Sequence, residues 1–184
     1  MSKQPVLSIC IPTYQRIEIT RNTIKSIYAD FEGVDMEDFE VIVSDNDPAE
    51  SSRVFEQEFK FENFHYYPTT CEGFLNSYYV LGYGKGEFLK LQNNSSMFRK
   101  GSLAHLIGQI KNYSASKPIL FHTNGALKRF DIREYHSADD FYHNLSYYSS
   151  WSAGFGIWKV DYDRFHDVKS INKMFPQTTL LMSC

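Results

Sequence analysis

The sequence predicts an α/β protein whose sheet is mostly parallel and carries helices on both faces. Through about residue 115, short apolar segments of the kind that form buried strands alternate with segments whose apolar residues recur at helical spacing. That alternation is typical of βαβ units, which place helices over a parallel sheet. The chain has 184 residues, 42% of them hydrophobic, so we expect a single domain with one sizeable core over residues 1–184.

The expected elements of this first part come in strand–helix pairs. Strands are expected at residues 6–11, 39–43, 65–67 and 88–91, and helices at about 17–29, 54–59, 73–83 and 103–110. Pro12 is expected to end the first strand, because proline has no N–H for a sheet hydrogen bond.

From about residue 118 the pattern changes to an α+β character. Strands are expected at residues 119–122, 127–132 and 155–160, with an aromatic helix near 141–148. The chain ends at 178-TTLLMSC-184, which reads like the start of an apolar helix. We therefore expect the chain to be truncated at its C-terminus.

Composition and charge argue against several classes of protein. The chain has 19 basic and 22 acidic residues without a long basic run, so no nucleic-acid partner is expected. Its three cysteines lack metal-like spacing and fit a reducing cytosol. No signal-peptide core and no apolar run of about 20 residues is present. We expect a cytoplasmic protein, at most peripheral at the inner face of a membrane.

Three widespread catalytic motifs are missing from the sequence. No Gly-x-Gly-x-x-Gly follows the first expected strand, and there is no Gly-Lys-Ser/Thr phosphate loop and no Gly-x-Ser-x-Gly elbow. The six histidines show no metal-binding spacing. A dinucleotide enzyme, an ordinary NTPase and a serine hydrolase of the α/β type are therefore disfavoured.

Polar residues gather where three expected strands end, which is where parallel sheets bind ligands. These segments are residues 12–16, 44–47 and 92–96. Tyr14 could stack on a base and Arg16 could pair with a phosphate, but a half-buried tyrosine and a surface arginine are an equally good interpretation. Asp45 and Asp47 could accept hydrogen bonds from a base or a ribose. Taken alone, their residue types favour ordinary turn and N-cap roles.

Taken together, these segments resemble the GT-A glycosyltransferases of family 2, which are inverting enzymes with nucleotide-sugar donors. The resemblance covers about residues 5–110. It rests on 7-LSICIPTYQR-16, 39-FEVIVSDND-47, Gly73 and Asn76 ahead of 85-KGEFLKLQNN-94, and 99-RKGSL-103. Farther on, 151-WSAGFGIWK-159 and 175-FPQT-178 are similar to capsule and O-antigen members related to abequosyltransferases.

The resemblance implies a role for each matching residue. About 1–115 would form the nucleotide-sugar-binding half and about 116–184 the acceptor half, with Trp151 and Ser152 bordering the acceptor. The residues implied in nucleotide-sugar binding are Pro12, Thr13, Tyr14, Arg16, Asp45, Asn46, Asp47, Gly73, Asn76, Gln92, Asn93, Asn94, Ser95 and Ser96.

The metal site of the family is where this sequence departs from the pattern. The family's Asp-x-Asp cluster falls on Asn94, Ser95 and Ser96, so its usual acidic ligands for Mg²⁺ or Mn²⁺ are absent and no metal ligand is assigned. The enzyme could be metal-independent, with Arg99 or Lys100 stabilising the diphosphate. It could instead bind a metal weakly through the diphosphate alone, or be inactive.

The general base that inversion requires is not assigned. Asp161 and Asp163 are candidates by residue type, but both are expected between a strand and a helix, where Asp is a common N-cap. We expect transfer of one sugar, with inversion, to a lipid-linked or oligosaccharide acceptor in bacterial surface polysaccharide synthesis. The alternative is an inactive GT-A module that binds nucleotide or glycan, and an unrelated α/β nucleotidyltransferase is a third.

Overall fold

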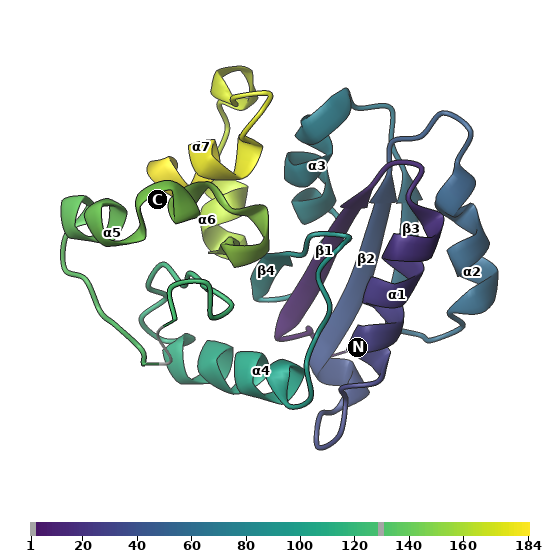
Figure 1. Cartoon of the computed structure of the whole chain (residues 1–184), viewed down its shortest axis with the longest axis horizontal. Helices are drawn as coiled ribbons and strands as arrows, with labels where there is room; N and C mark the ends of the chain where they lie inside the picture. Colours follow the sequence, from purple (N-terminus) through teal and green to yellow (C-terminus); the bar gives the residue numbers. More distant parts are fainter. Residues whose placement is uncertain (1–2, 129–130) are drawn as a thin grey trace.

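The computed structural model describes residues 3–128 and 131–184 and contains one five-stranded sheet (Figure 1). The strand order is β3-β2-β1-β4-β5, with β1–β4 parallel and β5 antiparallel to β4. The strands are β1 (Leu7–Thr13), β2 (Phe39–Asp45), β3 (Phe64–Pro68), β4 (Phe88–Leu91) and β5 (Gly156–Trp158). The predicted α/β class with a mostly parallel sheet is confirmed.

Helices cover both faces of the sheet because strand side chains alternate between the two sides. On one face, Ile9 and Val41 pack with α1 (Ile17–Tyr28), α2 (Phe55–Glu58) and α4 (Ser102–Tyr113). On the other, Cys10 and Ile42 pack with α3 (Asn76–Gly82) and α7 (Pro176–Ser183). The remaining helices are α5 (Ala138–Leu145) and α6 (Lys159–Arg164). No helix of the described residues is long and apolar enough to cross a bilayer.

Six short 3₁₀ turns connect the described elements. They are η1 (Met36–Asp38), η2 (Ser51–Val54), η3 (Gly73–Leu75), η4 (Ser146–Ser150), η5 (Ser152–Gly154) and η6 (Val168–Ser170). The predicted second helix is the short helix α2, which directly follows η2. The aromatic helix ends at Leu145, and the chain continues as η4.

Strand β1 does not end at Pro12, as predicted, but continues to Thr13. The C=O of Cys10 accepts from the N–H of Gln92 on the β4 side, at 2.8 Å. Pro12 lies two residues farther along and faces the same side, where β4 has already ended at Leu91. Its missing N–H therefore removes no hydrogen bond between strands.

The strand predictions for the second part are largely wrong. Residues 119–122 form no strand, because the His122 N–H bonds to the Gly154 C=O of the turn η5 (2.9 Å) rather than to a strand. The strand predicted at 127–132 includes residues 129 and 130, which lie outside the described residues, and its described flanks are not strand. The strand predicted at 155–160 is limited to Gly156–Trp158, because α6 begins at Lys159.

The order in which strands are added to the sheet reverses at β1. Strands β2 and β3 add on one side of β1, whereas β4 adds on the other. Parallel sheets bind ligands at the carboxyl ends of their strands beside such a switch point. The ends of β1 and β4 are therefore where a site is expected.

Candidate functional site

A buried asparagine joins three elements at this end of the sheet. Asn76, the first residue of α3, is 2% exposed. Its Nδ2 donates to the Ser44 C=O at 2.8 Å and to Asn46 Oδ1 at 3.1 Å, and its Oδ1 accepts from Ser44 Oγ at 2.7 Å. A longer contact of 3.5 Å reaches the Thr13 C=O of β1. Four of the predicted residues or their neighbours are thus held in one network.

Asn46 extends this network to the loop before η3. Its Nδ2 donates to the Gly73 C=O at 3.2 Å and to the Cys71 C=O at 3.3 Å. Gly73 has φ +51°, a left-handed conformation that suits glycine, and open space faces its Cα. Phe74 follows with its side chain 60% exposed. Sequence analysis missed Phe74, and its exposed ring beside a predicted site residue is visible only in the structure.

The two aspartates of this loop are bonded internally. Asp45 is fully buried and accepts from the backbone N–H groups of Asp47 (3.0 Å) and Ser52 (2.9 Å) and from the Tyr66 hydroxyl (3.3 Å). Burial raises the pKa of Tyr66, and the neighbouring carboxylate adds to the effect. Asp47, 3% exposed, accepts from Ala49 N–H and Gln15 Nε2, both at 3.2 Å. Both carboxylates brace the loop, in the turn role that their residue types favour.

Two predicted residues just after β1 are exposed. The side chain of Tyr14 is 50% exposed, and Arg16, also exposed, is the N-cap residue of α1. A shallow pocket of about 620 Å³ lies against the first turn of α1 and η2. Its lining residues are Gln15, Arg16, Ile17, Glu18, Ile19, Arg21, Ser51 and Val54. A ring and a cation are therefore available to a ligand at the end of β1.

Residues 92–96, which we call the polar turn, fold back on themselves after β4. Gln92 Nε2 donates to the Ser96 C=O at 2.7 Å, and Asn93 Oδ1 accepts from Ser95 N–H at 3.3 Å. Asn94 is 8% exposed, and its Nδ2 lies 3.5 Å from Thr13 Oγ1. Its C=O accepts from Thr23 Oγ1 of α1 at 2.7 Å. The polar turn is thus fixed to β1 and α1, with Ser95 exposed.

The polar turn does not fit a divalent cation. It offers no carboxylate, and its amide groups are used within the turn or toward β1. Across residues 3–128 and 131–184, no three His, Cys, Asp or Glu side chains come together in a way that could hold a metal ion. Metal independence stays a prediction.

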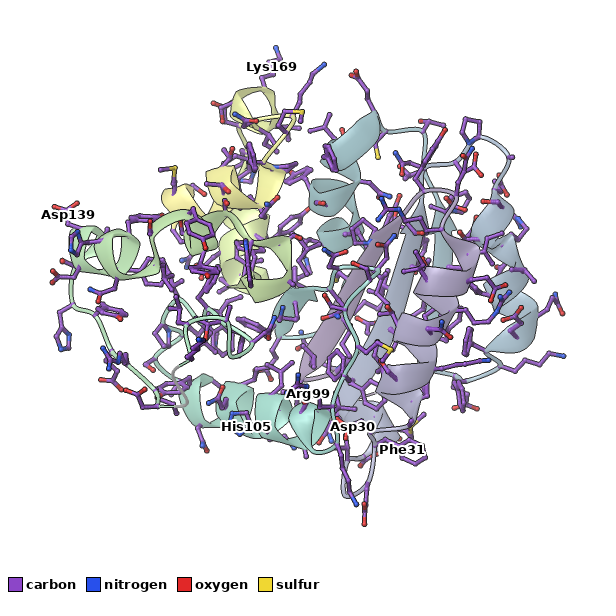
Figure 2. The ribbon with its side chains drawn as sticks, in the orientation of Figure 1. Asp30, Phe31, Arg99, His105, Asp139 and Lys169 are labelled. Atoms are coloured by element: carbon purple, nitrogen blue, oxygen red, sulfur yellow. The ribbon has the colours of Figure 1, made fainter. Side chains whose placement is uncertain are left out.

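The suggestion that Arg99 or Lys100 stabilises a diphosphate is wrong. Both precede α4, and Figure 2 shows Arg99 close to Asp30, just past the C-terminal end of α1. The polar turn instead contacts Thr13 at the end of β1 through Asn94. Lys100 pairs with Glu32 at 3.3 Å, and Asp30 accepts from Gly101 N–H at 2.5 Å. Helix α1 runs back along the sheet, so its end marks the amino ends of the strands.

The acceptor-side predictions lie on the other flank of β4. Trp151 is 37% exposed and meets the Tyr148 ring edge-on, with centroids 4.6 Å apart. Ser152 opens η5. Asp161 and Asp163 lie within α6 and pair with Arg164 (3.5 Å) and Lys159 respectively, so neither is the N-cap residue. The structure assigns neither as a base.

Comparisons with known proteins agree with the fold. The family model described as Glycosyl transferase family 2 matches residues 8–135. A search of curated proteins found no match. Among solved structures, TarS of S. aureus superposes with a TM-score of 0.67 at 13% identity, covering 96% of this chain and 33% of TarS. Residues 1–349 of TarS in complex with UDP-GlcNAc give a TM-score of 0.51 at 17% identity, covering 59% of this chain and 32% of that one.

A second protein has a similar fold. The mannosyltransferase PcManGT from Pyrobaculum calidifontis, in complex with GDP-Man and Mn²⁺, gives a TM-score of 0.62 at 12% identity. That match covers 97% of this chain and 51% of PcManGT. The chain thus spans between a third and a half of the length of these structures. At such low identities the likeness concerns the fold.

Proposed function

The chain belongs to glycosyl transferase family 2 and has the GT-A fold, and from this premise we propose that it transfers one sugar from a nucleotide-diphosphate sugar to a glycan or lipid-linked acceptor. The observation that carries the proposal is the hydrogen-bonded network at the strand ends. It holds the ends of β1 and β2, the start of α3 and the polar turn together beside the switch point.

The donor would lie over the ends of β1 and β2. Tyr14 supplies a ring for a base, and Arg16 supplies a cation for a phosphate. Asp45 and Asp47 would support the loop beneath the donor, since both oxygens of Asp45 and Oδ1 of Asp47 already accept hydrogen bonds within the protein. The exposed neighbours Gly73 and Phe74 would border the ligand. Solved neighbours of the same fold carry UDP-GlcNAc or GDP-Man, which supports a nucleotide sugar as ligand.

The reaction would be a single displacement with inversion. The oxygen of an acceptor hydroxyl forms a bond to the anomeric carbon while the bond from that carbon to the diphosphate oxygen breaks. The hydroxyl proton passes to a base that is not assigned, and the diphosphate leaves with the bonding electrons. Because the polar turn does not fit a metal, hydroxyl and amide donors such as Ser95 would face the departing phosphate.

The acceptor and the cellular setting follow from the resemblance of the second part. That part is similar to capsule and O-antigen enzymes, so we propose a role in bacterial surface polysaccharide synthesis at the cytoplasmic side of the membrane. Trp151 and Ser152 would contact the acceptor, because sugar C–H faces pack on exposed aromatic rings.

A non-catalytic module that binds nucleotide or glycan is the second candidate. The specific observation in its favour is the polar turn, which offers no carboxylate where the family carries its metal ligands. Slow hydrolysis of a bound nucleotide sugar would separate the two candidates, because a module that only binds leaves the donor intact.

Calorimetric binding of UDP, dTDP, GDP and CMP, each with Mn²⁺ and with EDTA, tests the proposal. We expect one nucleotide to bind with an affinity that survives EDTA. Tyr14→Ala should weaken that binding about tenfold or more, because base stacking on an aromatic ring is lost. Tyr147→Ala, at a 65% exposed tyrosine of η4, is the matched control and should bind as the wild type does. Failure of every nucleotide to bind would remove the donor-site assignment.

A further inference from the structure

One buried cation lies between the two flanks of the proposed site. Lys90, in the middle of β4, is 4% exposed. Its Nζ donates to the Leu91 C=O at 2.9 Å and to the Ala153 C=O. Neither partner is a carboxylate, and burial lowers the pKa of Lys90 to about 7. Burying an amine without a counter-ion is unfavourable. An apolar side chain could fill the same space, so the two hydrogen bonds are what distinguishes Lys90 from an apolar residue.

The two carbonyls that Lys90 bonds belong to different flanks of the site. Leu91 is the last residue of β4, and the polar turn begins at the next residue. Ala153 lies in η5, two residues after Trp151. A single ammonium group therefore joins the base of the polar turn to the segment that carries the proposed acceptor contacts.

Hydrogen bonds from other parts of the chain to its backbone carbonyl groups hold the segment 150–154 in place. The Ala153 C=O also accepts from Asn124 Nδ2 at 3.3 Å. The Gly154 C=O accepts from His122 N–H at 2.9 Å, and the Ser150 C=O accepts from Gln177 Nε2 at 2.7 Å. Among these donors, Lys90 is on the strand that leads into the polar turn. It is the side-chain donor from that strand to the segment, next to the backbone bond from the Leu91 N–H to the Phe155 C=O at 3.1 Å.

We propose that Lys90 is a positioning residue that fixes the distance between the polar turn and the segment 150–154. The consequence of this positioning for sugar transfer rests on the proposed function, whereas the hydrogen bonds of Lys90 do not depend on it. An apolar residue at position 90 would offer no donor and would leave the Ala153 C=O with Asn124 as its donor.

Hydrogen exchange measured by mass spectrometry on the full chain tests the proposal. In Lys90→Met, the Leu91 amide and the amides within residues 119–126 and 150–156 should exchange about tenfold faster or more, because a buried hydrogen bond to this segment is lost. The His122 N–H and the Leu91 N–H, which bonds the Phe155 C=O, are the direct reporters. Amides of β2 and β3 should exchange as in the wild type.

Three further variants make the test specific. Asn124→Ala removes the exposed second donor to the same carbonyl and should speed exchange in the same peptides by a smaller factor. The two substitutions should combine non-additively, since they share one acceptor. Lys111→Met removes a lysine that bonds the Asp38 carboxylate at the other end of the sheet, and it should leave residues 150–156 unchanged. Lys90→Arg keeps donors at this position and should restore most of the protection.

Two results would overturn the proposal. One is wild-type exchange of residues 150–156 in Lys90→Met; the other is faster exchange that is equal in β2 and β3, which is the behaviour of a general core residue. If Lys90→Met does not fold, unchanged exchange of residues 150–156 in Asn124→Ala has the same meaning.

Nucleotide binding separates this inference from the proposed function. The nucleotide that binds the wild type in the panel above should bind Lys90→Met within about twofold, because the substitution leaves Tyr14 and Arg16 in place. If no nucleotide binds the wild type, the proposed function fails and the exchange result still decides the positioning role. In a transfer assay, Lys90→Met should raise KM for the acceptor and leave KM for the donor unchanged.

Discussion

Residues 3–115 and residues 116–184 hold their polar groups in different ways. In the first part, side chains at neighbouring strand ends bond one another, as Asn76 does with Ser44 and Asn46. In the second part, backbone carbonyls accept from side chains that lie far away in the sequence, as Ala153 does from Lys90. The first arrangement follows from a regular sheet, whereas the second requires the sheet to be in place already.

The difference shows what each part contributes to a site. A network of neutral amides and hydroxyls at strand ends is fixed by the sheet itself, so its geometry needs no tether from the second part. The segment 150–154 has little regular structure of its own. Its position depends on tethers, and an acceptor site there would be only as well defined as those tethers.

We expect the largest effect on stability from a change to the apolar contact between the two parts. Leu180 of α7 is fully buried against the face of the sheet that α3 covers. Leu180→Ala should lower the free energy of unfolding by about 2–5 kcal/mol, measured by chemical denaturation, because it leaves a cavity. Met182→Ala, at a 70% exposed position of the same helix, is the control. A separate early transition in Leu180→Ala would mean that α7 unfolds independently of the sheet.

The next test concerns the neutral network of the first part. Asn76→Ala removes the acceptor of the buried Ser44 hydroxyl and the donor to Asn46 Oδ1, so we expect a loss of about 2–3 kcal/mol in the free energy of unfolding. Asn144→Ala, at a partly exposed asparagine of α5, should change stability by less than about 0.5 kcal/mol. Equal effects of the two substitutions would mean that the network does not brace the strand ends.

The buried lysine predicts a dependence of stability on pH. The pKa of Lys90 is about 7 in the folded chain, far below the ordinary lysine value, so above pH 7 the unfolded chain binds the proton that the folded chain releases. Stability must therefore rise with pH in this range. Relative to Lys90→Met, the wild type should gain about 1 kcal/mol between pH 7 and pH 8, measured by denaturation at each pH. Parallel curves for the two proteins would contradict a buried, deprotonating lysine.

The smallest expected effect belongs to a surface ion pair that joins the two parts. Lys173 lies 3.0 Å from Glu72, and the two side chains are 70% and 78% exposed. Lys173→Ala should change the free energy of unfolding by less than about 0.5 kcal/mol, because water and salt screen exposed charges. A larger loss in thermal denaturation would show that surface charges, and not buried tethers, hold the second part.

The same contrast explains how much could be predicted from the sequence. The strands and helices through residue 113 were predicted within a few residues, because apolar periodicity alone defines buried strands and amphipathic helices. It was also predictable that polar residues would lie together at one edge of the sheet, since parallel strands end there. The residues that do so are Thr13, Asn46, Asn76 and Asn94. In the second part, residues 119–122 have the apolar character of a strand, but they meet a 3₁₀ turn instead of a strand.

Individual side-chain roles were harder to predict than their location. Asp45 has the type and place of a ligand contact, but the backbone of its own loop occupies its oxygens. Arg99 follows the polar turn closely in sequence, yet the chain between them runs to the other end of the sheet. Lys90 has no sequence signal at all, since a lysine in a strand is ordinarily exposed. Only the packing of η5 against β4 makes it a buried donor.

The turn that precedes β4 has a consequence for the order of folding. The buried carboxylate of Glu40, in β2, accepts from Ser8 Oγ of β1 at 2.6 Å and from the N–H groups of Lys85 (2.6 Å) and Gly86 (3.2 Å). This acceptor site exists only after β1 and β2 have paired. We therefore expect β4 to join late, after a long loop has closed, and the lysine tether to form last of all. In a refolding experiment, protection of β1 and β2 amides should precede protection of β4.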